Sequence, residues 1–297
     1  MDSKDILDNE KEELNKINSK NKLKKLKSDY FLQKVFNIIT KKISLEIIKY
    51  NKNIQRRLDI NTNDYKEYSE LYSSIEIEII PIKKKYGKFI NIDVEDEKYY
   101  HIYFNNNKEK EIKSTTYLNK YDKVSKINII IDYQVKSLNE LFCSCNCIES
   151  IYFKKFKRNN IIGMNSMFFE CKSLQELNLS NFNTDNVTDM GCMFCYCSSL
   201  KELNLSNFNT NNATNMNAMF CECSSLKELN LSTFNTNNVT NMSSMFDGCS
   251  SLKELNLSNF STNNVIDMKM MFWGCSRKLK SEIKKKYKIF DKEAFKN

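Results

Sequence analysis

Glycine, proline, histidine and tryptophan are scarce in this chain. It contains 5 glycines, 1 proline, 1 histidine and 1 tryptophan among 297 residues. With so few glycines there is no glycine-rich phosphate-binding loop, and no nucleophile elbow or spaced pair of functional carboxylates stands out. The single histidine, His101, lies in an alternating run that predicts a strand. We therefore expect no enzyme activity, no catalytic residue and no cofactor.

Long apolar runs are missing as well. No stretch approaches the roughly 20 apolar residues that a membrane-spanning helix needs. Residues 1–14 are polar and acidic, where a secretory signal would have an apolar core. The 11 cysteines suit a reducing compartment if they are free thiols. These features predict a cytoplasmic protein without a transmembrane segment.

Positive charge is unevenly distributed along the chain, whose net charge is +9. Residues 145–275 carry nine basic and eleven acidic side chains, whereas residues 276–297 carry nine basic and three acidic ones. A basic segment can attract nucleic acid or an anionic membrane surface. Because lysine and asparagine are abundant throughout, we interpret the charge as solvated surface and expect no specific nucleic-acid partner.

The most informative feature present is a unit of 26 residues that recurs almost unchanged. Its first position is a cysteine in every copy: Cys145, Cys171, Cys197, Cys223, Cys249 and Cys275. A fixed period between 20 and 50 residues is typical of stacked repeat proteins, which expose a long face for binding. The repeat therefore favours a binding protein over an enzyme.

Each unit contains two kinds of apolar spacing. Leu255 and Leu257 alternate with polar residues, which predicts a short, half-buried strand. Val187, Met190 and Met193 fall at i, i+3 and i+6, which predicts a short helix. An asparagine stands where that helix would need an N-cap, at Asn186, Asn212, Asn238 and Asn264. Each unit is predicted to be a strand, a turn, a short helix and a turn.

Neither half of a unit can bury its apolar side alone, so we expect the units to stack with parallel strands about 4.8 Å apart. The predicted fold class is an α/β repeat, a leucine-rich-repeat-like solenoid with a parallel sheet, preceded by a small helical and β region. The expected segments are a charged N-terminus (1–27), a short helical module (28–72), a small β region that caps the stack (73–134), the solenoid (135–275) and a basic C-terminal cap helix (276–297). Within the β region, alternation predicts strands over 75–79, 88–94, 99–104 and 124–131.

Residues 135–275 carry a family resemblance. The repeated string Leu-Asn-Leu-Ser-x-Phe-x-Thr-x-Asn-Val-x-x-Met-x-x-Met-Phe-x-x-Cys resembles the BspA-type leucine-rich repeats. The resemblance implies a non-enzymatic protein-binding module. BspA-type proteins are often exported adhesins, so a surface adhesin is one alternative function if an export signal is missing from this sequence.

A second resemblance lies in residues 26–58. The segments Phe31-Leu-Gln-Lys-Val-Phe36 and Leu45-Glu-Ile-Ile are similar to parts of an F-box. This resemblance implies a substrate adaptor of a ubiquitin ligase, which would dock a Skp1-like subunit on these helices. The alternative is a plain helical packing element.

Cysteines also stand close together, as in Cys192-x-x-Cys195-x-Cys197, a spacing that suggests zinc. However, other units carry phenylalanine, aspartate or tryptophan at the position of Cys195, and no histidine lies in the repeats. The first-position cysteines fit a buried column of small apolar side chains. We therefore expect no metal site.

Polar residues flank the inward leucines of each predicted strand and form ladders. The candidate partner-binding residues are Glu176, Glu202, Glu228, Glu254, Asn178, Asn204, Asn230 and Asn256. Carboxylates spaced about 4.8 Å apart repel one another. The residues that precede them are expected to offset this repulsion: Gln175, Lys201, Lys227 and Lys253. We predict that this sheet face binds a polar or basic protein partner; the alternative is that the ladders only solvate the sheet.

Overall fold

The computed structural model describes residues 51–107, 109–112 and 115–296, together with Gln33, Leu45 and Ile48. The chain divides into two compact units, residues 1–72 and 73–297. In the first unit the helices with described bounds are α5 (Lys52–Arg57) and α6 (Thr62–Tyr72). Most of residues 26–58, on which the F-box-like resemblance depends, lies outside the described residues.

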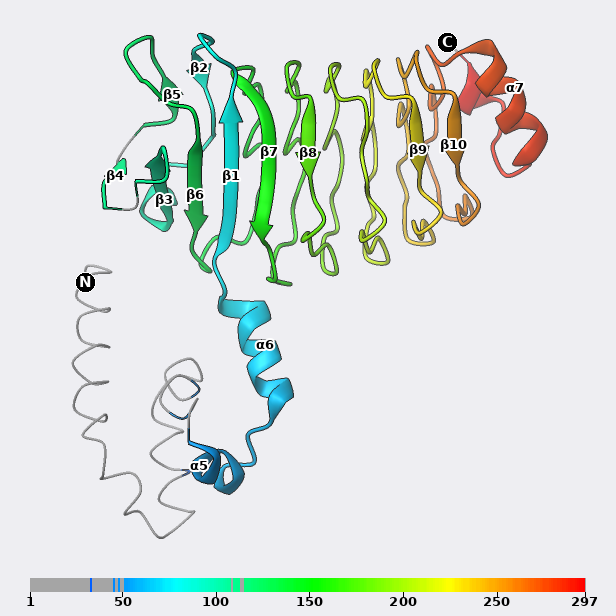
Figure 1. The fold of residues 1–297 in the computed structure, drawn as a ribbon. Helices are drawn as coiled ribbons and strands as arrows, with labels where there is room; N and C mark the ends of the chain where they lie inside the picture. The colour runs from blue at the N-terminus through cyan, green and yellow to red at the C-terminus, as the bar shows by residue number, and fades with distance from the viewer. Residues whose placement is uncertain are drawn as a thin grey trace. The chain divides into compact units, whose positions relative to one another are not determined.

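A six-stranded mixed sheet opens the second unit, in the strand order β4-β3-β6-β1-β7-β8 (Figure 1). Its strands are β1 (Ile75–Pro81), β3 (Tyr100–Phe104), β4 (Glu111–Ile112), β6 (Ile127–Ile131), β7 (Ile148–Lys155) and β8 (Glu176–Asn178). Strand β1 pairs antiparallel with β6 and β7, and β7 pairs parallel with β8. The sheet thus changes from antiparallel to parallel at β7, the first strand of the repeats.

One strand prediction before the repeats is wrong, the one over residues 88–94. Only Gly87–Lys88 is a strand there, β2, which pairs antiparallel with β5 (Tyr117–Leu118). Phe89 and Ile90 are nonetheless fully buried. Two consecutive inward side chains break the alternation that an extended strand requires, so the chain leaves the ladder after Lys88.

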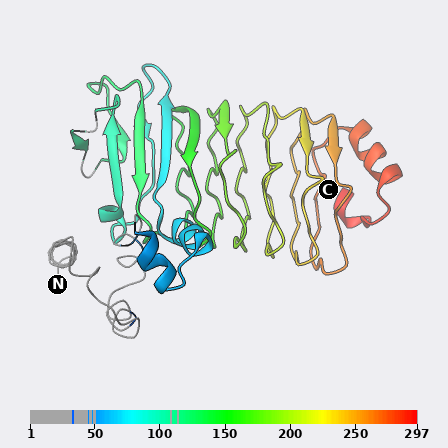
Figure 2. The ribbon, with the colours of Figure 1, turned by 60° about the horizontal axis from the view of Figure 1, so that its bottom comes forward.

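Beyond β8 the repeated units lie side by side (Figures 1 and 2). Strands β9 (Glu228–Asn230) and β10 (Glu254–Asn256) pair in parallel. On the turns, residues 26 positions apart form parallel bridges from Ser137 to Asp267. A repeat fold is therefore confirmed in general form, although of its strands only β7 and β8 belong to the mixed sheet and β9 and β10 form a separate parallel pair.

The repeated apolar positions form the core of the stack. All six first-position cysteines are buried. From Cys171 onward each thiol donates to the backbone carbonyl 29 residues earlier, as Cys171 Sγ does to Phe142 O at 3.0 Å, whereas Cys145 Sγ donates to Cys143 O. The rings of Phe142 and Phe168 stack with centroids 5.6 Å apart, and this stacking continues through successive units to Phe272. Apolar burial along the stack is thus continuous from one unit to the next.

The prediction of a short helix in each unit is wrong. The segment from Met190 to Cys197 consists of turns, and no α-helix is assigned anywhere between residues 148 and 276. Cys192 (φ 53°) and Tyr196 (φ 60°) adopt left-handed backbone conformations, as do their counterparts in the other units. Left-handed residues interrupt a right-handed helix. The spacing of the buried methionines therefore comes from repeated tight turns.

The asparagines predicted as N-caps have another role. In each case the Nδ2 group donates a hydrogen bond to a backbone carbonyl of the preceding unit. The pairs are Asn186 with Asn159 (2.7 Å), Asn212 with Asp185 (2.6 Å), Asn238 with Asn211 (2.7 Å) and Asn264 with Asn237 (2.6 Å). These side chains connect neighbouring units instead of ending a helix.

Helix α7 (Arg277–Lys286) follows the last unit. Ser276 caps it by accepting a hydrogen bond from the Leu279 amide at 3.2 Å, and Leu279 and Ile283 are buried. Among the described residues, no helix combines the length and apolar character that a membrane crossing needs. The five-segment division of the chain stays a prediction.

Candidate protein-binding face

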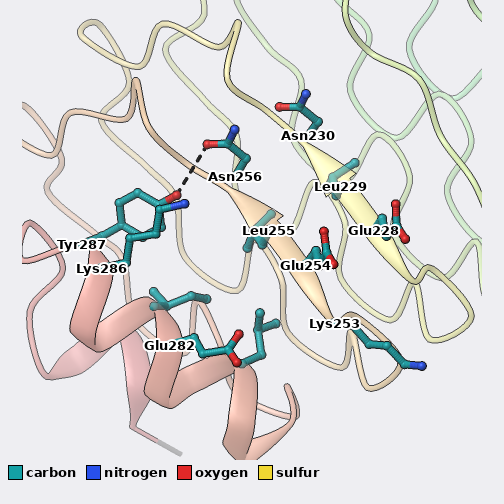
Figure 3. Close-up of a pocket in the computed structure, with 12 residues that line it drawn as sticks. Glu228, Leu229, Asn230, Lys253, Glu254, Leu255, Asn256, Glu282, Lys286 and Tyr287 are labelled. Atoms are coloured by element: carbon teal, nitrogen blue, oxygen red, sulfur yellow. Dashed lines mark hydrogen bonds between the residues drawn. The ribbon is translucent and has the colours of Figure 1, made fainter.

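The predicted ladder residues lie on one side of the repeat strands. In β8, β9 and β10 the central leucine is buried and the glutamate before it is exposed. Figure 3 shows Glu228 and Glu254 next to each other on neighbouring strands, with Asn230 and Asn256 further along. We call the surface formed by the eight ladder residues the strand face: Glu176, Glu202, Glu228, Glu254, Asn178, Asn204, Asn230 and Asn256.

The strand face is interrupted at its centre. Residues 201–205 are not assigned as a strand, and within the described chain Glu202, Leu203 and Asn204 make no backbone hydrogen bond to a neighbouring unit. Leu203 is only half-buried, whereas its counterpart Leu229 is 3% exposed. A hollow of about 420 Å³ lies here, lined by the Glu202 and Glu228 units. The middle of the face therefore lacks the strand pairing that β8, β9 and β10 have.

A second hollow, of about 480 Å³, lies at the C-terminal end of the face. Figure 3 shows it between the strands that carry Glu228 and Glu254 and the helix that carries Glu282. The Tyr287 hydroxyl accepts a hydrogen bond from the Leu257 amide at 3.1 Å and lies 3.5 Å from Asn256 Oδ1. Helix α7 thus forms a wall at this end of the strand face.

Three of the four ladder carboxylates have no internal partner. Within the described part of the chain, Glu202, Glu228 and Glu254 form no ion pair and no side-chain hydrogen bond. Glu176 differs, because its Oε2 accepts a hydrogen bond from the Tyr152 hydroxyl at 2.5 Å. That bond raises the pKa of Tyr152. The unpaired carboxylates are therefore available to an external cation.

The ladder asparagines have a structural role that sequence reasoning missed. Each Oδ1 accepts a hydrogen bond from the amide of the serine two residues later, the contact that defines an Asx turn. The pairs are Asn178–Ser180 (2.9 Å), Asn204–Ser206 (3.0 Å), Asn230–Ser232 (3.0 Å) and Asn256–Ser258 (3.1 Å). The repeated Asn-x-Ser spacing was the available signal. Only the Nδ2 groups of these residues remain for a partner.

His101 and the cysteines are the remaining titratable groups that the sequence singles out. His101 lies in β3, with Nδ1 2.8 Å from Glu111 Oε1 and Nε2 3.4 Å from Asp132 Oδ2. Burial opposes the charged imidazolium, but these two hydrogen bonds outweigh it and raise the pKa of His101. Over the described ranges no three His, Cys, Asp or Glu side chains are grouped so that they could hold a metal ion. All 11 cysteines are free thiols.

One family model matches this chain, over residues 115–228 and 197–295, which together are more than half of it. The chain belongs to the DUF285 family. That family is described as a Mycoplasma protein of unknown function. No curated protein matches the chain.

Two solved structures are similar to this DUF285 chain. One is a leucine-rich repeat protein from Bacteroides ovatus, with 22% identity over 46% of this chain and 31% of that one, at a TM-score of 0.32. The other is a leucine rich cell surface protein from Faecalibacterium prausnitzii, with 16% identity over 63% of this chain and 46% of that one, at a TM-score of 0.35. The DUF285 chain thus spans less than half of either protein.

The first of these structures is described as a leucine-rich repeat protein and the second as a leucine rich cell surface protein. The F-box-like resemblance and the Skp1-like partner receive no support from these comparisons. The cytoplasmic location expected from the sequence is corrected, because the Faecalibacterium prausnitzii match is a cell surface protein. The expectation depended on the missing apolar runs, the composition of residues 1–14 and the cysteines, and none of these features determines a compartment.

Proposed function

We propose that this DUF285 protein is a non-enzymatic leucine-rich repeat solenoid that binds another protein on its strand face. The observation that carries the proposal is the row of exposed, unpaired carboxylates of Glu202, Glu228 and Glu254. Like charges directly opposite each other on neighbouring strands destabilise a sheet. A partner that brings lysine or arginine side chains to this row would relieve the repulsion and gain charge-assisted hydrogen bonds.

The stack supports such binding by holding the carboxylates at a fixed spacing. Side-chain hydrogen bonds between units, such as Thr210 Oγ1 to Asn235 O at 2.9 Å, fix each unit against the next. A partner would therefore meet a preorganised surface, which lowers the entropic cost of association. The hollow beside Glu202 and Glu228 gives room for a long basic side chain. At a cell surface this binding would take the adhesin-like form that the BspA-type resemblance implies.

Affinity capture with the purified full-length protein tests this function. We would compare the wild type with the double variant Glu202→Lys/Glu228→Lys, using an extract of the source cells that includes surface proteins. The control is Glu95→Lys/Glu97→Lys, which makes the same change in net charge at two exposed positions outside the strand face. The proposal expects the first variant to lose the captured proteins and the control to retain them. Equal capture by all three proteins would contradict it.

A further inference from the structure

Three thiols outside the core column form a cluster. The column cysteines bond to backbone carbonyls, as Cys197 Sγ does to Phe168 O at 3.2 Å. Cys195, in contrast, lies close to Cys192 in its own turn and to Cys221 in the next unit, and both neighbours raise its pKa. We call these three residues the thiol cluster. It lies on the turns of two neighbouring units, whereas the strand face lies on the strands.

Backbone hydrogen bonds fix the thiol cluster. The Cys195 amide donates to Cys192 O at 3.1 Å and closes a tight turn between these two residues. The Tyr196 amide donates to Cys221 O at 2.7 Å and connects the turn to the next unit. Residues at the ends of such a four-residue turn have Cα atoms within about 7 Å. A disulfide spans about 4.4–6.8 Å between Cα atoms, so the turn brings Cys192 and Cys195 into this range.

Accessibility separates the cluster from the other thiols. Cys192 and Cys221 are partly exposed, and Cys195 is 3% exposed behind them. The neighbouring column thiols Cys197 and Cys223 are fully buried. A small oxidant in solvent therefore reaches Cys192 while the column cysteines stay covered.

We propose that Cys192 and Cys195 form a thiol-oxidation site, which hydrogen peroxide converts into an intramolecular disulfide. The Cys192 thiolate attacks one peroxide oxygen, the O–O bond breaks, and hydroxide leaves, giving a sulfenic acid on Cys192. The Cys195 sulfur then attacks the Cys192 sulfur, an S–S bond forms and the S–O bond breaks. The Cys195 proton and the departing hydroxide leave as water. Two thiols are oxidised and one peroxide is reduced.

The local electrostatics agree with this order of events. The neighbouring Cys195 thiol lowers the pKa of Cys192 to about 7, although burial and Asp189 oppose the charge. The thiols of Cys192 and Cys221, together with burial, raise the pKa of Cys195. Because the thiolate is the nucleophile, Cys192 is the attacking residue and Cys195 the resolving one.

Peptide mapping of the full-length protein tests the site. The reduced protein is treated with hydrogen peroxide, alkylated under denaturing conditions and digested without reductant. We expect a Cys192–Cys195 disulfide to be the main product, with the column cysteines alkylated. A Cys195–Cys221 link as the main product, or oxidation spread evenly over the 11 cysteines, would overturn the assignment.

Two variants sharpen the test, each checked for folding by circular dichroism. Cys221→Ser should still form the Cys192–Cys195 disulfide, because Cys221 takes no part in the reaction. Cys195→Ser should accumulate the sulfenic acid on Cys192, which dimedone captures as a stable adduct. If Cys195→Ser gives no more dimedone adduct at Cys192 than the wild type does, Cys195 is not the resolving thiol and the proposal fails.

Discussion

Glu228 lies directly opposite Glu254 in the parallel pair β9–β10, with Leu229 opposite Leu255 between the glutamates and the ladder asparagines. The register places like charges side by side on the outer surface while the leucines fill the core. Apolar burial therefore determines the register, and the repulsion between the glutamates is a cost that the fold tolerates.

Neutralising one member of this pair should stabilise the protein. Glu228→Gln removes the repulsion from Glu254 while keeping the size of the side chain, so we expect a gain of roughly 0.2–1 kcal/mol in the free energy of unfolding. Urea denaturation at low salt measures it. The gain should shrink at high salt, where the charges are screened, and Glu95→Gln, at an exposed position away from the strands, should show none. A loss of stability in Glu228→Gln would contradict the account.

The Asx turns predict a different response at the asparagines. Asn230→Ala removes the acceptor for the Ser232 amide, and we expect it to cost about 1 kcal/mol of stability. Asn230→Asp retains an acceptor oxygen, so at high salt it should unfold at nearly the wild-type denaturant concentration. Equal destabilisation by both substitutions would show that the Oδ1 contact is not what matters.

Glycine at a left-handed backbone position should not reduce the thermal stability of the protein, and it can increase it. Ala218 has φ 49°, a conformation that costs an L-residue roughly 1–2 kcal/mol and glycine almost nothing. Ala218→Gly should therefore leave the melting temperature unchanged or raise it. Ala213→Gly is the matched control at a buried position without a positive φ, and it should lower the melting temperature. The same decrease in both variants would contradict the assigned backbone geometry.

His101 gives the fold a defined pH dependence. Its folded-state pKa lies above the usual 6.5 because of its bonds to Glu111 and Asp132. A raised folded pKa means that the stabilisation is fully present below the unfolded pKa and is lost as the pH rises through the folded pKa. Substituting His101→Gln should therefore reduce stability at about pH 5.5 and change it much less at about pH 8. Chemical denaturation at both pH values measures this, and a pH-independent effect would contradict the role of the imidazolium.

Much of the architecture follows from the sequence because the repeat is regular. The cysteine, leucine and methionine columns are buried where the period predicts them, except at Leu203 and Met268, which are partly exposed. The prediction of a short helix was wrong because apolar residues at i and i+3 also fit successive tight turns. In addition, Cys192 and Tyr196 adopt left-handed conformations, which their residue types do not indicate. Glycine marks that conformation only in the last units, at Gly248 and Gly274 (φ 69° each).

The centre of the strand face could not be predicted from local sequence. Residues 201–205 read Lys-Glu-Leu-Asn-Leu, identical to residues 227–231 and 253–257, yet Leu203 lies outside any strand while Leu229 and Leu255 lie in β9 and β10. The difference must come from packing between units, which a single repeat does not encode. The hollow beside Glu202 was therefore visible only in the folded chain.

Titration of a captured partner onto the full-length protein tests the central claim most directly. The dissociation constant would be measured for the wild type, for Glu202→Lys/Glu228→Lys and for Glu95→Lys/Glu97→Lys, each at two salt concentrations. We predict that reversing the two strand-face charges weakens binding at least tenfold, that wild-type affinity falls as salt rises, and that the control variant behaves as the wild type does. A dissociation constant that is unchanged by the strand-face substitutions and by salt would contradict binding through this face.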